Sequence, residues 1–368
     1  MKDFVGIINL DEREDNIREL TNTRPLASVP LAARYRIIDF VLSNMTNSGI
    51  ESIGIFAKND SRSLVDHLSN GRPWDLHRKR DGLRFFNFGQ AAPVDDDVHM
   101  FANNLDFIKY SKEEYVIIAP SYMICNINLI EAANYHKSTG ADITIIYKSV
   151  NNANDHFYGC DLLNINQENR VVSVGENIGS SKDANIGMEM FLMRKDLFVS
   201  IVYECVKTGR WKKIKQCIYD SLNSYFVNAF AFEGYLACIN SLQAYYKANM
   251  DLLNVRVNNE LFFDNGPIYT KSKDECPTKY TNDSKVVNSI VANGCYIEGT
   301  VENCVIARRV RIKKGAYLKD SIILQNTIIG PDAIIVNAIT DKFSYIPKGE
   351  ELRGSKKFPV VIEKAKMF

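Results

Sequence analysis

The sequence predicts an α/β domain with a mostly parallel sheet and helices on both faces, followed by a smaller parallel β-helix. Two observations predict this arrangement. In the first two thirds of the 368 residues, short apolar segments alternate with amphipathic segments of helical length. In the last third, aliphatic residues recur at a nearly constant period. Strands that alternate with helices need crossover connections, and such connections give a parallel sheet that is covered on both faces.

The expected strands of the α/β domain are short, apolar and bounded by polar or turn-forming residues. They span residues 4–10, 51–57, 115–120, 141–150 and 187–193. The expected helices span residues 36–50, 129–140 and 241–254. Gly49 and Gly140 are expected to end two of these helices, because glycine adopts the left-handed conformation easily. We therefore place the α/β domain at residues 1–254.

The C-terminal third contains an internal repeat. Four nine-residue segments begin at residues 289, 304, 321 and 338, with Ile or Val second and Ile ninth. A glycine or proline follows each segment within three residues. This spacing is typical of a β-helix, in which each coil buries its inward residue on the coil below. A β-sandwich is the alternative, but its strands would not superimpose at one period. We expect a linker at 255–287 and a β-helix at 288–368.

Composition excludes several classes of protein. The net charge is only +1, which argues against a nucleic-acid partner. No apolar run reaches the roughly 20 residues that cross a bilayer, and the N-terminus does not resemble an export signal. The eight cysteines include no CxxC pair and are expected to be reduced. We therefore expect a cytoplasmic protein without a nucleic-acid or membrane partner.

The histidines bear on whether the β-helix is itself an enzyme. Many β-helices of this type are acyltransferases with a histidine base, but all five histidines precede the repeat. They are His67, His77, His99, His136 and His156. The β-helix is therefore expected to supply a subunit interface rather than catalysis.

Four segments and the repeat resemble one family over essentially the whole chain. They are PLAARYRIIDFVLSNMTNSGI (30–50), NGRPWDL (70–76), EEYVII (113–118) and AYYKANMDLL (244–253). On these residues the chain resembles bacterial ADP-glucose pyrophosphorylase (glucose-1-phosphate adenylyltransferase). The resemblance implies a Rossmann-like nucleotidyltransferase domain joined to a left-handed parallel β-helix, in tetramers. It also implies a Mg²⁺-dependent reaction of ATP with glucose 1-phosphate, which gives ADP-glucose for glycogen or starch.

The chain departs from the family where the nucleotide should bind. The family's GGxGTRL loop falls on residues 11–17, where Asp11, Glu12 and Glu14 replace glycines and Asn16 replaces the arginine. Glycine is needed there because the backbone approaches the phosphates closely. A carboxylate about 6 Å from a phosphate charge repels it by roughly 3 kcal/mol at a dielectric of 20. ATP is therefore not expected to bind here in the family's manner.

Further positions that the resemblance marks as functional have also changed. A lysine of the family falls on Leu26, and its sugar-phosphate lysine falls on Asn177. Its two metal-binding aspartates fall on Tyr122 and Cys238, and neither side chain offers Mg²⁺ a carboxylate oxygen. The acidic run Asp95, Asp96 and Asp97 could suggest a metal site instead, but we interpret it as a solvated loop. We expect no catalytic residue, metal or cofactor in this chain.

This pattern resembles the D-type subunit of the family, which lacks the catalytic groups. It implies a non-catalytic, modulatory subunit of a hetero-oligomer, expected to be a heterotetramer with an active paralogue that holds the Mg²⁺. Two alternatives stay open: a weakly active pyrophosphorylase, and a sugar-phosphate sensor that works alone.

A basic run at residues 307–319 could bind an effector. We consider an anion site for a sugar phosphate or nucleotide made of Arg24, Arg36, Arg309 and Arg311, because arginine binds phosphate through paired hydrogen bonds. The alternative is a solvated basic edge. The outward positions Tyr296, Tyr317 and Tyr345 are candidates for a subunit interface.

Overall fold

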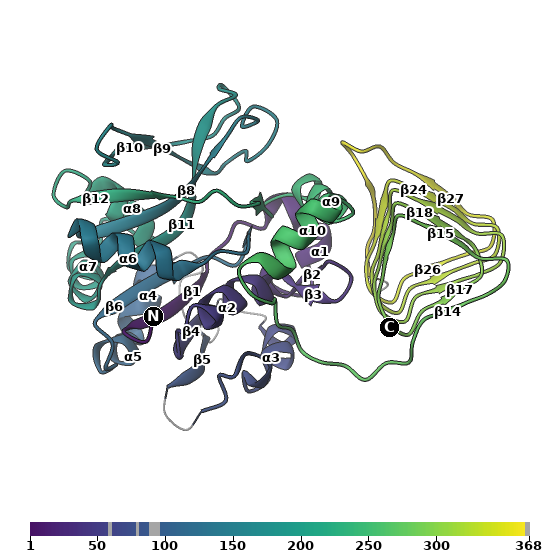
Figure 1. Cartoon of the computed structure of the whole chain (residues 1–368), viewed down its shortest axis with the longest axis horizontal. Helices are drawn as coiled ribbons and strands as arrows, with labels where there is room; N and C mark the ends of the chain where they lie inside the picture. Colours follow the sequence, from purple (N-terminus) through teal and green to yellow (C-terminus); the bar gives the residue numbers. More distant parts are fainter. Residues whose placement is uncertain (58–60, 79–80, 88–95, 365–368) are drawn as a thin grey trace. The chain divides into compact units, whose positions relative to one another are not determined.

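The chain forms two compact units in the computed structural model, which describes residues 1–57, 61–78, 81–87 and 96–364 (Figure 1). The first unit comprises Met1–Glu12, Ile38–Cys238 and Phe262–Tyr269. The second comprises Arg13–Ile37, Ile239–Leu261 and Thr270–Phe368. The expected boundary near residue 254 is therefore too simple, because two segments of the expected α/β domain belong to the unit that contains the β-helix.

The first unit is built on a nine-stranded sheet in the order β10-β9-β11-β6-β1-β4-β5, with β8 beside β11 and β12 beside β8. The strands are β1 (Phe4–Leu10), β4 (Ser52–Ala57), β5 (Gly82–Asn87), β6 (Tyr115–Ala119), β8 (Ile143–Val150), β9 (Asp161–Ile165), β10 (Val171–Glu176), β11 (Ala184–Arg194) and β12 (Val227–Ala231). Strands β6, β1, β4 and β5 are parallel, which confirms the crossover pattern. Strand β11 is antiparallel to β6 and β8, which the sequence pattern did not indicate.

Helices cover both faces of this sheet. One face packs against α4 (Asp97–Asn103), α5 (Leu105–Lys109), α7 (Lys195–Thr208) and α8 (Ile214–Asp220) in a single apolar cluster. The opposite face carries α2 (Ile37–Asn47) and α6 (Leu129–Thr139). Helix α2 approaches β1 closely because Gly6 has no side chain: a Cβ there would lie 2.8 Å from the Met45 sulfur. None of the helices in the described residues is long and apolar enough to cross a membrane.

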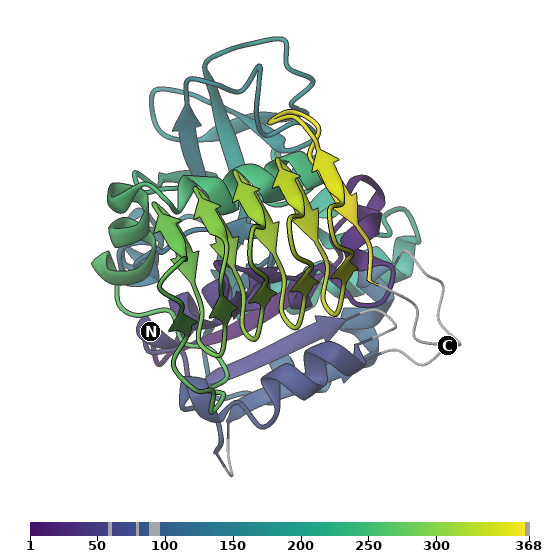
Figure 2. The same cartoon turned by 90° about the vertical axis from the view of Figure 1, so that its right-hand side faces the viewer.

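The β-helix consists of three parallel sheets of five strands each (Figure 2). Its strands are β14 (Lys279–Tyr280), β15 (Lys285–Val287), β16 (Ile290–Val291), β17 (Tyr296–Ile297), β18 (Thr300–Glu302), β19 (Val305–Ile306), β20 (Arg311–Ile312), β21 (Tyr317–Lys319), β22 (Ile322–Ile323), β23 (Ile328–Ile329), β24 (Ile334–Val336), β25 (Ala338–Thr340), β26 (Tyr345–Ile346), β27 (Glu351–Arg353) and β28 (Val360–Ile362). Strands β14 and β15 form a first coil inside the expected linker, which also contains α10 (Val255–Asn259).

The ninth position of the repeat forms the inward column that the sequence predicted. Ile297, Ile312, Ile329 and Ile346 pair in register and are at most 3% exposed. The second position lies outside this apolar core, yet Val305, Ile322 and Ile339 are also buried.

Two segments from earlier in the chain are attached to the third sheet of the β-helix. In α9 (Leu242–Asp251), the Tyr246 hydroxyl donates to the Asp320 carbonyl at 2.6 Å. The Arg24 guanidinium binds the Asp341 carboxylate at 2.6 Å. These contacts explain why residues 13–37 and 239–261 belong to the second unit.

Substitution in the inward column tests this core. Ile329→Ala removes a fully buried side chain from β23 and should lower the free energy of unfolding by about 2–5 kcal/mol. Ile328→Ala, on the same strand but facing outward and half-buried, is the matched control and should cost distinctly less. Urea unfolding would measure both, and equal losses would contradict the assigned register.

Candidate functional site

The acidic segment after β1 binds donors of its own unit instead of lying free. The Asp11 carboxylate pairs with the Lys213 ammonium at 2.7 Å. One oxygen of Glu12 accepts hydrogen bonds from the backbone N–H of Ser121, at 2.8 Å, and from its hydroxyl, at 2.7 Å. The carboxylates that were expected to repel a nucleotide are thus partnered. A phosphate group would have to displace them to reach the same donors.

The rest of this segment has local structural roles in the second unit. Glu14 accepts a hydrogen bond from the Leu26 backbone N–H at 2.7 Å, and Asp15 pairs with Arg18 at 2.5 Å. Asn16 is exposed within a 3-10 turn (Asp15–Ile17). None of residues 11–16, all of which the structure describes, has a positive φ. The backbone therefore does not take the left-handed turns with which a glycine-rich loop surrounds phosphate.

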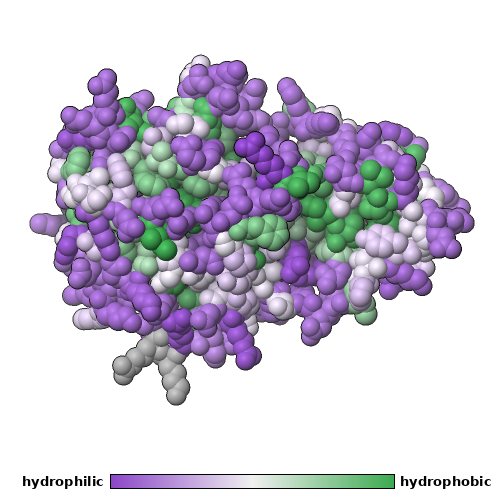
Figure 3. Space-filling model, viewed as in Figure 1, coloured by the Kyte–Doolittle hydropathy of each residue, from purple (hydrophilic) through white to green (hydrophobic). Residues whose placement is uncertain are grey.

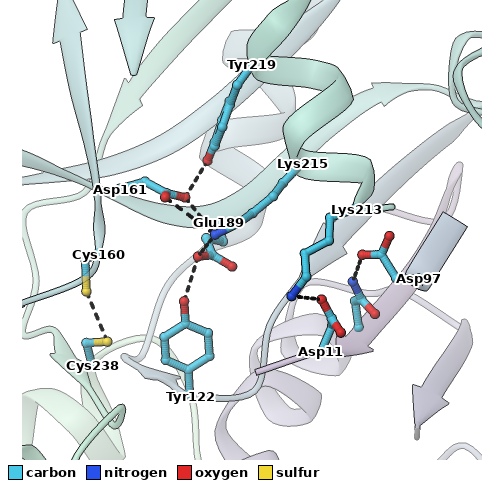
Figure 4. A network of polar contacts seen from close by, with 11 residues as sticks. Asp11, Asp97, Tyr122, Cys160, Asp161, Glu189, Lys213, Lys215, Tyr219 and Cys238 are labelled. Atoms are coloured by element: carbon cyan, nitrogen blue, oxygen red, sulfur yellow. Dashed lines mark hydrogen bonds and ion pairs between the residues drawn. The ribbon is translucent and has the colours of Figure 1, made fainter. Parts of the chain in front are cut away.

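The start of α8 carries a second ion pair, which is partly buried: the Lys215 side chain is 30% exposed and that of Glu189 is 16% exposed (Figure 4). The Lys215 ammonium contacts Glu189 at 2.5 Å and Asp161 at 3.2 Å. The Tyr122 hydroxyl donates a hydrogen bond to the Glu189 carboxylate, and the Tyr219 hydroxyl donates one to the Asp161 carboxylate, both at 2.7 Å. Lys215 and Tyr219 are four residues apart on α8 and so face the same way.

The ionisation of this network follows from its burial. Burial alone lowers the pKa of Lys215, but the carboxylates of Glu189 and Asp161 outweigh it and raise that pKa above its ordinary value. Burial, followed by the charge of Glu189, raises the pKa of Tyr122, so this phenol stays protonated and acts as a donor. Lys215 is therefore a permanent cation held by two of the chain's own carboxylates.

Asp97 is buried, contrary to the interpretation of residues 95–97 as a solvated loop. Its carboxylate accepts hydrogen bonds from the Ile214 backbone N–H at 2.8 Å and from the Asn9 amide at 2.9 Å. Burial, and then the charge of Asp11, raises the pKa of Asp97 to about 7. Asp96 caps α4 by accepting from the His99 N–H, and Asp95 lies outside the described residues.

The remaining departures from the family pattern are packed into the fold. The Asn177 amide donates to the carbonyls of Ala153, His156 and Phe157 at 2.9–3.0 Å and is buried. Leu26 is fully buried in a short 3-10 helix (Leu26–Ser28). The Cys238 thiol lies 3.2 Å from that of Cys160. Among the residues that the structure describes, no group of three or more His, Cys, Asp or Glu side chains could hold a metal ion.

The ion pairs of this network determine how much positive charge a polyanionic substrate would meet at α8. Three carboxylates, those of Asp11, Asp161 and Glu189, surround the two ammonium groups of Lys213 and Lys215. Nucleotidyl transfer needs cations and donors that stabilise the charge of phosphate groups. Here the lysines already have anionic partners, so the arrangement is suited to holding the fold and not to binding a triphosphate.

The second unit contains a basic cluster that includes two of the four candidate arginines. Arg24 and Arg36 lie near Lys342, whose pKa is lowered to about 6 by burial and then by these two guanidinium charges. Lys273 also belongs to the cluster, since burial and then the charges of Arg308 and Arg36 lower its pKa. The Arg24 Nε atom is buried and has no hydrogen-bond partner in the described residues. Asp341 supplies a carboxylate to this crowded set of cations.

The other two candidate arginines are placed differently. Arg309 is exposed and binds Glu275 at 2.6 Å, and Arg311 is exposed on β20. Sequence reasoning missed Lys273, Arg308 and Lys342. Arg309 has a φ of 58°, so the chain turns there and the alternation of inward and outward residues is interrupted. This corner is why Arg308, and not its neighbour, is buried.

Comparison with known proteins supports the assignment of both parts. A family model described as "Nucleotidyl transferase" matches residues 15–254, and one described as "GlmU-like, C-terminal hexapeptide" matches residues 276–356. The hexapeptide match agrees with a left-handed β-helix. The chain is 35% identical to "Glycogen biosynthesis protein GlgD" of Bacillus subtilis over 364 residues, 98% of this chain and 96% of that protein.

Other relatives include a second GlgD protein and a protein that is named as an enzyme. The chain is 37% identical to "Glycogen biosynthesis protein GlgD" of Geobacillus stearothermophilus, over 86% of this chain and 82% of that protein. It is 30% identical to "Glucose-1-phosphate adenylyltransferase" of Mycoplasma mobile, over 87% of this chain and 85% of that protein. The resemblance stated from the sequence is thereby confirmed.

The buried Asp97 predicts an unusual dependence of stability on pH. Its folded pKa of about 7 lies above the ordinary 3.8, so the native state keeps a proton that the unfolded chain has lost. Stability should therefore fall as pH rises from about 4 to about 7, by up to about 4 kcal/mol in total.

Asp97→Asn should remove this loss of stability with rising pH, so the variant should be more stable than the wild type at pH 8. The new amide can still accept from Ile214, and it can donate to the Asn9 oxygen, which has no partner in the described residues. Chemical denaturation between pH 5 and pH 8 would measure the slope. Asp15→Asn, at a 70% exposed side chain, is the control that should leave it unchanged. An unaltered slope in Asp97→Asn would contradict the assignment.

Proposed function

The chain belongs to the nucleotidyl transferase family, and we propose that it acts as a non-catalytic, modulatory subunit of a glucose-1-phosphate adenylyltransferase hetero-oligomer. The hetero-oligomer would make ADP-glucose for glycogen synthesis in the cytoplasm, and the Mg²⁺ would be held by an active paralogue. One observation carries the proposal: Lys213 and Lys215 are held by carboxylates of the same chain.

The energy of substrate binding explains why this observation matters. A micromolar nucleotide complex corresponds to about 8 kcal/mol. A triphosphate that displaced Glu189 and Asp161 from Lys215 would leave two partly buried carboxylates without their cation. It would also meet their repulsion, roughly 3 kcal/mol for each carboxylate about 6 Å from a phosphate charge at a dielectric of 20. Such a cost removes most of the binding energy of a micromolar ligand, so turnover is assigned to the partner subunit.

The basic cluster supports a regulatory role for the second unit. Arg36 is shared by both parts of the cluster: its charge lowers the pKa of Lys342 together with Arg24, and the pKa of Lys273 together with Arg308. These like charges repel one another, although Asp341 and Glu275 offset part of the repulsion. A bound anion would relieve that repulsion and satisfy the buried Arg24 Nε. We assign a phosphorylated effector, a sugar phosphate or nucleotide, to this cluster.

The first coil of the β-helix supports association with a partner. Its inward residues Tyr280, Val286 and Val291 continue the apolar columns, but no further coil covers them, and Tyr280 is 51% exposed. Strands β14, β15 and β16 are the edge strands of the three sheets. Apolar side chains gather at this end, which is turned toward the viewer on the right of Figure 3. Open edges and apolar ends of this kind favour contact with another chain, and we assign the paralogous subunit to this surface.

Two alternatives are separated from this proposal by simple measurements. A weakly active pyrophosphorylase would release ADP-glucose when the chain alone meets ATP, glucose 1-phosphate and Mg²⁺. A sugar-phosphate sensor that works alone would elute from its host without a paralogue. The pairing of Lys213 and Lys215 with carboxylates disfavours the weakly active enzyme, and the open first coil disfavours the sensor that works alone.

The partner's kinetics test the proposed function. The chain alone should form no ADP-glucose above background. Added to the active paralogue of the same organism, it should shift the paralogue's kcat, KM or effector response by about 5- to 150-fold, the range of ordinary couplings between sites. Unchanged kinetics with a saturating amount of this chain would rule out a modulatory role.

A paired substitution tests the effector site. Arg36→Gln with Lys273→Gln should weaken binding of phosphorylated effectors about tenfold or more, because each change removes a charge-assisted contact. Arg309→Gln, at an exposed arginine with its own partner Glu275, is the control and should change binding little. Calorimetric titration of inorganic phosphate and sugar phosphates would measure this. Equal losses in both variants would point to a diffuse charge effect instead.

A further inference from the structure

Two thiols meet in the first unit although 78 residues separate them in sequence. Cys160 directly precedes β9, and Cys238 ends β13 (Ala237–Cys238). Their sulfur atoms lie 3.2 Å apart, and the residues are only 1% and 4% exposed. In Figure 4 the two side chains point toward each other beside the Glu189 network.

The two sulfur atoms are in direct non-bonded contact, and a small movement would let them form a bond. A disulfide needs its sulfur atoms about 2.0 Å apart, so the thiols must approach by about 1.2 Å from their 3.2 Å separation. Metal binding is not an alternative within the described residues, since no third His, Cys, Asp or Glu ligand completes a group there.

We propose that Cys160 and Cys238 are a reversible modification site, at which a peroxide oxidises the two thiols to an intramolecular disulfide. One sulfur attacks the peroxide and becomes a sulfenic acid, and water leaves. The second thiol then attacks that sulfur, the S–S bond forms, and a second water leaves. Two thiols are oxidised and one peroxide is reduced, so two RSH and H2O2 give RSSR and two H2O.

The bond would connect the two sides of the ion-pair network. Asp161, which holds Lys215, is the next residue after Cys160. Strand β13 pairs with β7 (Met123–Ile124), which follows Tyr122. A disulfide would therefore join the strand that positions Asp161 to the strand pair beside Tyr122, and it would restrict the unfolded chain.

The environment also predicts the speed of the reaction. Burial, followed by the neighbouring Cys160 and Glu189, raises the pKa of Cys238, so little of this thiol is ionised. Thiolates are the reactive form, and the exposed Cys276 should therefore react first. The disulfide should form slowly in the native protein, and any link between two chains should pass through Cys276 and be absent from Cys276→Ser.

A peptide mass map tests the proposal on the full chain, which is first reduced, then treated with hydrogen peroxide and blocked with an alkylating reagent. Digestion without reductant should yield the peptides of Cys160 and Cys238 joined, with a mass lower by two hydrogen atoms. Cys276→Ser, the control at an exposed cysteine, should retain this product, and Cys238→Ser should lose it. The digestion uses chymotrypsin, because trypsin would leave Cys217 and Cys238 on one peptide, whereas cleavage after aromatic residues such as Tyr219 and Tyr235 separates them.

Thermal unfolding gives a second measurement that does not depend on the variants. Oxidised wild-type protein should unfold several degrees higher than reduced protein, and dithiothreitol should reverse the shift. Recovery of Cys160 and Cys238 as separately alkylated or over-oxidised residues from folded, peroxide-treated protein would overturn the proposal. This inference is independent of the proposed function, because neither result depends on a partner subunit.

Discussion

Two lysines at the start of α8 and the acids that hold them determine what the first unit can do. Lys213 binds Asp11 at the end of β1, and Lys215 binds Asp161 and Glu189 on β9 and β11. These are the cations in this network, and in a nucleotidyltransferase such groups would face phosphates. In the proposed account, a polyanion would have to displace these carboxylates from their lysines, which opposes its binding.

The second unit has the opposite electrostatic character. Burial, and then the charges of Arg36 and Arg24, lower the pKa of Lys342 in its basic cluster to about 6. In the proposed effector role, a bound anion would relieve the repulsion among these cations. A first unit whose lysines are paired with carboxylates of the same chain, and a second unit that concentrates cations, are consistent with the proposed regulatory subunit.

The repeating architecture was predictable from sequence, but the partners of the site residues were not. Isoleucine at the ninth position showed the inward column, because that pattern depends only on period. The first coil was not predicted from the sequence, because polar residues such as Lys279 and Lys285 occupy its strands. The acids at residues 11–16 were expected to repel phosphate, but Lys213 and Ser121, the partners of Asp11 and Glu12, come from distant segments that no local pattern connects to them. The backbone turns at Arg309, so the simple alternation of inward and outward side chains along a strand could not predict that Arg308 is buried.

The most direct measurement is a calorimetric titration of the full-length Arg36→Gln/Lys273→Gln variant with ATP in the presence of Mg²⁺, because this variant lacks two cations of the basic cluster and so reports on the first unit. The ion pairs of Lys213 and Lys215 predict no saturable binding at micromolar concentrations, and no further uptake when glucose 1-phosphate is added. Stoichiometric, Mg²⁺-dependent binding of ATP at micromolar concentration would contradict the account, since it would mean that these lysines exchange their carboxylates for phosphate.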